Sequence, residues 1–187
     1  MLYWIGRTLS YIFFKSVFRL KVTGRQNLPS GGFIISANHN SLLDPPLIGA
    51  ALDRGIYFMA KKELFEIPLF GKLISMTHAI PVNRRSPGAK SIQEAIDIVR
   101  SGKIMMILPE GTRKNTRRIK AGVGLLSHKT GRPVVPARIV NNDRIKNLPR
   151  LEFRIKEPIK FPVSPAGPAE TGQYRDFARR VMEEIYG

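Results

Sequence analysis

The chain contains no cysteine and only three histidines, His39, His78 and His128, among its 187 residues. The absence of cysteine excludes disulfides, thiolate catalysis, iron–sulfur clusters and cysteine-ligated zinc. No two of the histidines are close enough in sequence to share one helix face. The sequence therefore offers little material for a histidine-rich metal site, and we expect no bound metal.

Acidic residues are also scarce: 14 Asp and Glu stand against 31 Lys and Arg, a formal net charge of +17. Residues 1–43 contain five basic residues and no acidic one, and residues 111–142 contain eight basic residues and no acidic one. Such a surface attracts nucleic acid, anionic lipid or phosphorylated ligands. We expect these two regions to lie near whatever anion is bound.

Long apolar runs are lacking even in the aromatic-rich first 20 residues, because Arg7, Lys15 and Arg19 interrupt them. The longest uncharged run between these cations has seven residues, far below the roughly 20 that a membrane span requires. The composition instead predicts that residues 1–24 form a helix at a membrane interface, ahead of a domain over residues 25–187. A helix packed on the core of the domain is the alternative that the sequence leaves open.

With 187 residues, of which 43% are hydrophobic, the chain can bury one core, which indicates a single domain. Apolar segments predict strands over residues 31–38, 55–60, 78–82, 103–108, 134–140 and 151–156. Helical segments alternate with them, which indicates an α/β fold: one layered domain with a mixed, mostly parallel sheet of about six or seven strands flanked by helices. The prolines around residues 133–136 favour an edge strand or a bulge there.

Two helices have clear boundaries. The first is predicted from Pro87 to Arg100, with Ser86 as its N-cap and Gly102 just past its end. The second is predicted from Tyr174 to Tyr186, where apolar residues recur at helical spacing, and we expect it to close the domain.

The segment Asn38-His39-Asn40-Ser41-Leu42-Leu43-Asp44 directly follows a predicted buried strand. In open α/β sheets, ligands bind beyond the carboxyl ends of the strands. The imidazole of His39 could remove a proton from a hydroxyl there, if Asp44 holds its other nitrogen through a turn. The alternative is that Asp44 is only an N-cap before Pro45 and that His39 is an ordinary turn residue.

A second polar segment, Glu110-Gly111-Thr112-Arg113, also follows a predicted strand. Glycine allows close approach of the backbone to a ligand, threonine donates a hydrogen bond, and the arginine fork suits a phosphate. Arg84 follows another strand and could clamp the same phosphate. A polar turn leading into a solvated basic run is the alternative.

Four segments, NHNSLLD, HAIPVNR, LPEGTR and RPVVPA, occur in this order over residues 38–137. Together they resemble the ordered motifs of the glycerophosphate and lysophospholipid acyltransferase family, in particular its small bacterial 1-acyl-sn-glycerol-3-phosphate acyltransferases. The second motif often opens with glycine in that family, whereas this chain has His78 there.

The resemblance implies an O-acyltransferase that moves a fatty acyl group from acyl-CoA or acyl carrier protein to the free hydroxyl of 1-acyl-glycerol-3-phosphate (lysophosphatidic acid), giving phosphatidic acid. By resemblance His39 is the general base and Asp44 its charge partner. The acceptor would be bound by Asn38, Arg84, Glu110, Gly111, Thr112 and Arg113. No metal or organic cofactor is implied. The expected partners are the acyl donor, the lysophospholipid and an anionic membrane surface, with the protein peripheral or monotopic at the cytoplasmic face of the cell membrane.

Other functions stay open. The acceptor could be another lysolipid or glycerol 3-phosphate, or the chain could be a non-catalytic lipid-binding module. The net charge also suggests a nucleic-acid-binding domain, but the basic run over residues 113–120 has no aromatic residue for base stacking, so we expect no nucleic acid. Ser41 lies in no GxSxG turn, which favours direct transfer over a serine-bound acyl intermediate.

Overall fold

The computed structural model of the chain describes residues 2–83, 88–110, 119–162 and 171–187. These residues form a seven-stranded sheet in the order β1-β7-β6-β2-β5-β3-β4. The strands are β1 (Lys21–Thr23), β2 (Phe33–Ala37), β3 (Ile56–Lys61), β4 (Ala79–Val82), β5 (Ile104–Ile107), β6 (Val134–Val140) and β7 (Glu152–Ile155).

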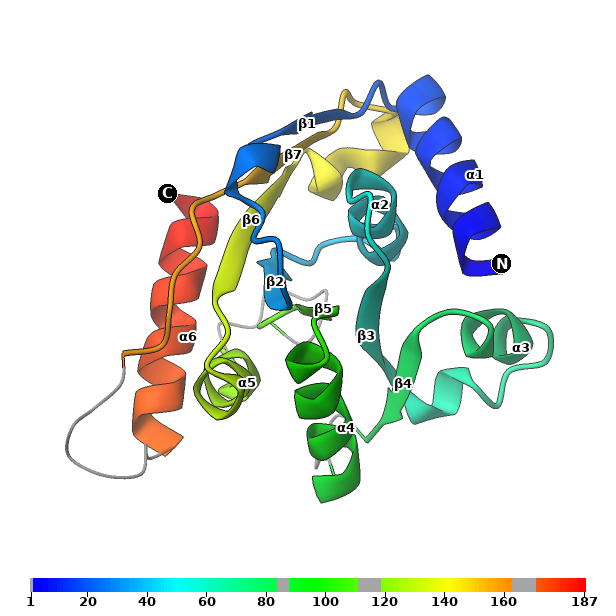
Figure 1. The fold of residues 1–187 in the computed structure, drawn as a ribbon. Coiled ribbons are helices and arrows are strands. Elements are labelled where there is room, and N and C mark those ends of the chain that lie inside the picture. The colour runs from blue at the N-terminus through cyan, green and yellow to red at the C-terminus, as the bar shows by residue number, and fades with distance from the viewer. Residues whose placement is uncertain (1, 84–87, 111–118, 163–170) are drawn as a thin grey trace.

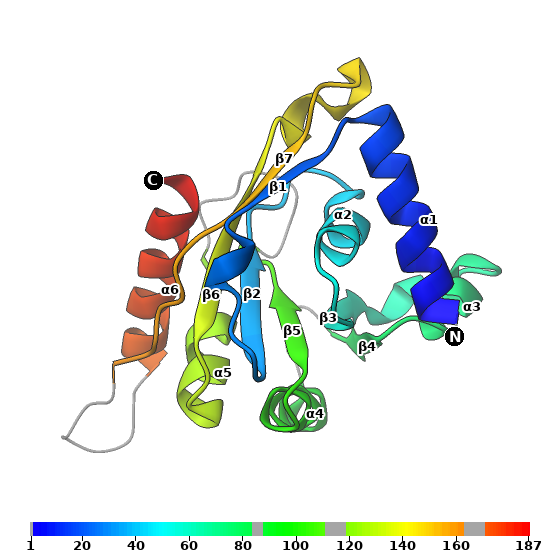
Figure 2. The same ribbon diagram turned by 45° about the horizontal axis from the view of Figure 1, so that its top comes forward.

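The α-helices are α1 (Leu2–Val17), α2 (Asp44–Ala51), α3 (Phe70–Ser75), α4 (Ala89–Arg100), α5 (Gly122–Thr130) and α6 (Thr171–Tyr186). Three short 3-10 helices, η1 (Arg25–Asn27), η2 (Lys62–Leu64) and η3 (Asn142–Asn147), lie in the connections. In Figures 1 and 2, α1 and α2 cover one face of the sheet, and α4, α5 and α6 cover the other. The fold is the α/β fold predicted from the sequence.

The sheet has an apolar core on each face, because successive side chains of a strand point to opposite sides. On β2, Phe33 and Ile35 belong to the core under α1 and α2, whereas Ile34 belongs to the core under α4, α5 and α6. All five residues of β2 are buried. This double burial explains why the segment is one continuous apolar run in the sequence.

The strand pairs are parallel, with the exception of β6 and β7. The carboxyl ends of β2, β3, β4, β5 and β6 therefore meet at one edge of the sheet. Ser36 of β2 pairs with Ile107 of β5, so His39 and Glu110 each follow three residues beyond that pair. The topology thus brings the two polar motifs to neighbouring strand ends.

One strand of the sheet was not predicted from the sequence. It is β1, because three residues are too few to show an alternating pattern. For the prolines the sequence predicted an edge strand or a bulge, and the structure shows a bulge, because β6 is paired on both sides. Ala137 pairs with Ile155 and Val134 with Ile159, so the partner segment carries one extra residue opposite Pro136. This bulge accommodates the missing proline N–H.

The two predicted helices are present. The first begins at Ala89 with Gly88 as N-cap, and the predicted start, Ser86 and Pro87, lies outside the described residues. Gly102 follows the helix end with φ +85°, as predicted for a left-handed residue in that place. Helix α6 buries its apolar stripe, Tyr174, Phe177, Val181 and Ile185, and packs against α5 and β6.

Helix α1 packs on the domain along one edge, as one of the two interpretations of the sequence expected, and its role at a membrane interface stays a prediction. One edge packs on the domain: Phe14 is buried, Tyr3 Oη accepts from the Ile56 amide at 2.8 Å, and Arg7 Nε donates to the Leu52 carbonyl at 2.6 Å. The rest of the helix exposes the large apolar side chains Trp4, Ile5, Leu9, Tyr11, Ile12, Phe13 and Val17. In the described part of the chain, no helix combines the length and the hydropathy needed to cross a bilayer.

His78, the first residue of the segment HAIPVNR, joins α1 to the sheet. Its ring stacks between Tyr3 of α1 and Tyr57 of β3, with centroid distances of 4.1 and 4.3 Å. Lys103 Nζ lies 5.1 Å from the centre of the Tyr57 ring, on which it makes a cation–π contact. Burial, with a smaller effect of the Lys103 charge, lowers the pKa of His78 below 6.5.

The lowered pKa of His78 predicts a stability change with pH. A histidine of this kind favours its neutral form in the folded state, so the free energy of unfolding falls as the pH drops below about 6.5. The variant His78→Phe keeps a ring between the two tyrosines and removes the titration. Denaturant unfolding near pH 8 and near pH 5 should show that the free energy of unfolding falls less on acidification in the variant than in the wild type. An equal loss in both proteins would contradict the prediction.

Candidate active site

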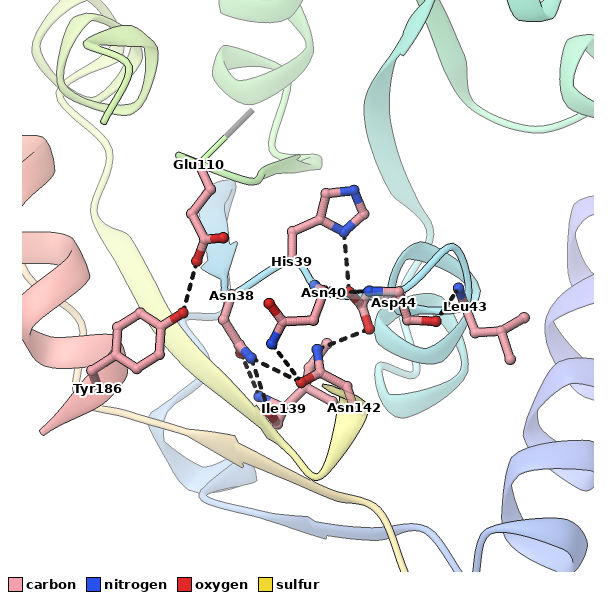
Figure 3. Close-up of polar contacts among 10 residues, drawn as sticks. Asn38, His39, Asn40, Leu43, Asp44, Glu110, Ile139, Asn142 and Tyr186 are labelled. Atoms are coloured by element: carbon pink, nitrogen blue, oxygen red, sulfur yellow. Dashed lines mark hydrogen bonds and ion pairs between the residues drawn. The ribbon is translucent and has the colours of Figure 1, made fainter. Parts of the chain in front are cut away.

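The predicted pair of His39 and Asp44 forms a direct contact at the carboxyl end of β2. His39 Nδ1 lies 3.0 Å from Asp44 Oδ2, and both side chains are buried, His39 at 6% and Asp44 at 0% exposure. Since a carboxylate accepts, Nδ1 carries the proton and the lone pair lies on Nε2. Nε2 hydrogen-bonds none of the described residues. Figure 3 shows the ring with this nitrogen turned away from Asp44.

Asp44 also orders the loop that carries His39. Its Oδ2 accepts hydrogen bonds from the backbone amides of Asn40 at 2.8 Å and Ser41 at 2.7 Å. Asp44 is the first residue of α2, and Leu43 occupies the N-cap position, so the N-cap alternative is wrong. The Ser41 hydroxyl accepts from the Leu43 amide within the same turn. The carboxylate therefore fixes both the imidazole and the backbone between it and α2.

Asn142, which was not predicted from the sequence, completes this cluster. Its Nδ2 donates to Asp44 Oδ1 at 3.0 Å, and its Oδ1 accepts from the side-chain amides of Asn38 and Asn40. Asn142 is 2% exposed and begins η3, two residues after the end of β6. No sequence signal pointed to it, because asparagines after a strand are typical of an ordinary turn.

Asn38 was predicted to bind substrate, and that role stays a prediction. In the structure its side-chain amide pairs with the backbone of β6: Oδ1 accepts from the Ile139 amide at 2.7 Å, and Nδ2 donates to the Ile139 carbonyl at 3.0 Å. The side chain therefore extends the pairing of β2 and β6 by one step.

Glu110 lies buried at the carboxyl end of β5, where the sequence placed it. Its Oε1 accepts a 2.8 Å hydrogen bond from the hydroxyl of Tyr186 on α6, a contact that the sequence did not indicate. Arg138 of β6 holds the same tyrosine, because its guanidinium donates to the Tyr186 carbonyl and lies over the ring. Burial, and then the hydrogen bond and charge of Glu110, raise the pKa of the Tyr186 phenol.

The remaining predicted residues, Arg84, Gly111, Thr112 and Arg113, lie outside the described residues, and their roles stay predictions. The site that the structure does describe is a histidine–carboxylate pair on a hydrogen-bonded loop, at the same edge of the sheet as a buried glutamate. A neutral imidazole with a held Nδ1 and a lone pair on Nε2 can accept a proton from a hydroxyl.

Comparison with known proteins places this geometry in a family. A family model described as Acyltransferase matches residues 19–140, a range that includes His39, Asp44 and Glu110. The chain belongs to the acyltransferase family. Asn142 and Tyr186 lie outside the matched range.

Individual acyltransferases are similar over much of this chain. It is 36% identical over 121 residues to a 1-acyl-sn-glycerol-3-phosphate acyltransferase of Bacillus subtilis, covering 63% of this chain and 61% of the relative. It is 33% identical over 138 residues to one of Borreliella burgdorferi, covering 70% of this chain and 55% of the relative. The chain thus spans less than two thirds of the length of these relatives.

A solved structure is also similar. The crystal structure of the 1-acyl-sn-glycerophosphate (LPA) acyltransferase PlsC from Thermotoga maritima superposes with a TM-score of 0.70 and 26% sequence identity. The match covers 97% of this chain and 77% of that one. The acyltransferase fold therefore includes nearly the whole of the present chain, with α1 and α6.

The contact between Tyr186 and Glu110 gives a second pH prediction. A tyrosine with a raised pKa stabilises the fold below its unfolded value of about 10, and that stabilisation is lost as the pH rises through the folded value. Tyr186→Phe should therefore reduce the free energy of unfolding by about 1 kcal/mol at neutral pH and flatten its decline above about pH 10.

A double-mutant cycle with Glu110→Gln supplies the control, because it removes the charge that faces the phenol. In the Glu110→Gln background, Tyr186→Phe should change the alkaline decline of the free energy of unfolding less than it does in the wild-type background. Denaturant unfolding across the alkaline range measures both effects. If the two substitutions are additive at every pH, the residues are not coupled.

Proposed function

We propose that this chain is a 1-acyl-sn-glycerol-3-phosphate acyltransferase, which moves a fatty acyl group from a thioester donor to the free hydroxyl of lysophosphatidic acid and forms phosphatidic acid. The observation that carries the proposal is the buried 3.0 Å contact between His39 Nδ1 and Asp44 Oδ2, at the edge of the sheet where the polar motifs meet. The activity named for the relatives from B. subtilis and B. burgdorferi supports it.

In the proposed reaction His39 is the general base. Its Nε2 takes the proton of the acceptor hydroxyl while the hydroxyl oxygen attacks the carbonyl carbon of the thioester. A C–O bond forms, the C–S bond breaks, and the sulfur leaves as a thiolate that can take the proton back from His39. Asp44 stabilises the imidazolium that exists between these steps. A thiolate is a good leaving group, so the reaction needs little acid assistance.

The carbonyl oxygen gains negative charge during the attack and needs hydrogen-bond donors. The backbone amides nearest to His39 along the chain, those of Asn40 and Ser41, donate to Asp44. These two amides are therefore committed to holding the carboxylate, and in the proposed mechanism other donors stabilise the oxyanion.

For the acceptor, we propose that Arg84 and Arg113 grip the phosphate, with Gly111 and Thr112 beside the glycerol. Arginine suits this task because its planar fork can give two hydrogen bonds to a phosphate. Parallel pairing of the strands supports the arrangement, since β4 and β5, which precede Arg84 and Glu110, end at the same edge of the sheet as β2. Glu110 and Asn38 complete the proposed acceptor site.

The proposed donor is acyl-CoA or acyl carrier protein, and the net charge of +17 suits either acidic molecule. We further propose that the protein is peripheral or monotopic at the cytoplasmic face of the cell membrane, with the exposed apolar side chains of α1 in the interface of an anionic bilayer. Aromatic and aliphatic side chains beside scattered cations are typical of interfacial helices. The proposed chemistry uses no metal and no organic cofactor.

The catalytic proposal is tested by His39→Gln. Loss of a general base lowers turnover by a factor of about 100 to 10,000. Purified protein with labelled acyl-CoA and lysophosphatidic acid should form phosphatidic acid, and the variant should lose this activity while vesicles containing lysophosphatidic acid still bind it.

The matched control is His128→Gln, because His128 lies on α5, on the far side of the sheet, and bonds Tyr174. It should retain turnover. Full activity of His39→Gln would remove the proposed base, and the absence of acyl transfer by the wild type to any lysolipid would favour a lipid-binding module.

The membrane proposal is tested by the double substitution Leu9→Glu and Ile12→Glu on the exposed face of α1. Removal of two large apolar side chains from the interface costs about 3 kcal/mol, or roughly a hundredfold in vesicle partitioning. Co-sedimentation with anionic vesicles measures this loss.

The matched control is Ala89→Glu with Gln93→Glu, which adds the same charge at exposed positions of α4 on the opposite face of the sheet. Equal losses for the two double variants would show that net charge, rather than the apolar face of α1, determines binding.

A further inference from the structure

The carboxylate of Asp44 receives hydrogen bonds on both oxygens. Among the described residues, Oδ2 accepts from His39 and from two backbone amides, whereas Oδ1 accepts from Asn142 Nδ2 at 3.0 Å. Asn142 comes 98 positions later in the chain, on the corner between β6 and η3. The oxygen that does not face the imidazole is thus held from a different element of the fold.

The orientation of the Asn142 amide follows from its other contacts. Its Oδ1 accepts from Asn38 Nδ2 at 3.2 Å and from Asn40 Nδ2 at 3.0 Å, and both of these partners are donors. Only Nδ2 can therefore face Asp44, which accepts. Asn38 is itself bonded to the backbone of Ile139. A chain of hydrogen bonds runs from β6 through Asn38 and Asn142 to Asp44, as Figure 3 shows.

We infer that Asn142 is a positioning residue of the His39–Asp44 pair. Its amide holds the carboxylate so that Oδ2 faces Nδ1, which keeps the lone pair of the imidazole on Nε2. This inference rests on the proposed role of His39 as general base. Asn142 lies beyond residues 19–140, the range that the family model matches.

The chemistry of the side chain fits this task. An amide satisfies the buried carboxylate and carries no charge, so the negative charge of Asp44 stays available to stabilise the imidazolium. A lysine or arginine in its place would neutralise that charge. A second carboxylate would repel it unless the two shared a proton.

This last contrast provides the test, the isosteric variant Asn142→Asp. At alkaline pH both carboxylates are ionised and repel each other, so Asp44 loses its donor and kcat should fall roughly 10- to 100-fold. As the pH is lowered the pair takes up one proton, and the protonated carboxyl group introduced by the substitution can donate to Asp44 as the amide did. The ratio of variant to wild-type kcat should therefore rise on acidification, by up to about tenfold per pH unit.

The substitution leaves the other titratable and charged groups around Asn142 in place. His39 faces Asp44 from the loop. Three charged residues of η3, Asp143, Arg144 and Lys146, are exposed to solvent. All four residues are present in both proteins. The Michaelis constant of the acceptor should change little, because the substitution acts on the positioning of His39 and therefore on kcat. Asn147→Asp, an exposed position of the same 3-10 helix, adds the same charge and should leave the ratio near one at every pH.

A second variant, Asn142→Ala, gives a readout without turnover. The proton on His39 Nδ1, assigned by its loss in His39→Gln, should shift or broaden in the NMR spectrum of Asn142→Ala. A wild-type signal in that variant would overturn the inference, even if Asn142→Asp failed to fold.

A pH-independent ratio for a folded Asn142→Asp would overturn it as well, and would assign Asn142 a purely structural role. Neither result affects the proposed function, which is tested separately by His39→Gln. If His39→Gln retained full turnover, the proposed function would fail first.

Discussion

The structure around the site depends on one buried carboxylate. A buried carboxylate is costly unless hydrogen bonds replace the water that it loses, and Asp44 is fully buried. Its partners are an imidazole, two backbone amides and the amide of Asn142. Each partner must keep its place for the carboxylate to stay satisfied. The loop over residues 38–43, the start of α2 and the corner after β6 are therefore fixed relative to one another.

The parallel sheet makes this cluster possible. Strands β2 and β6 are neighbours and run in the same direction, so the residues that follow them emerge side by side. Asn38 and Asn142 are 104 positions apart in the chain, yet their side-chain amides are in hydrogen-bond contact at 3.2 Å. Strand β5 lies on the other side of β2 and delivers Glu110 to the same edge. Three strand ends thus supply side chains to one small region.

The fold class could be predicted from the sequence because buried strands and their intervening helices have strong periodic patterns. The contact between His39 and Asp44 was also predictable, since the two residues are five positions apart and a single turn joins them. The partners from distant elements were not. Nothing in the local sequence of Asn142 or Tyr186 indicates which buried group each will meet, because their contacts depend on how β6 and α6 pack. Strand β1 was also missed, because its three residues are too few to show an alternating pattern.

Helix α1 packs along α2, and α2 begins at Asp44. Phe14 is buried in the same core as Leu47 and Ile48 of α2, and the Arg7 side chain is bonded to Leu52 at the end of that helix. The two helices therefore connect the exposed apolar side chains of α1 to Asp44, which holds the imidazole of His39. A surface that takes up those side chains would therefore also determine the distance and the tilt of the His39 ring relative to that surface.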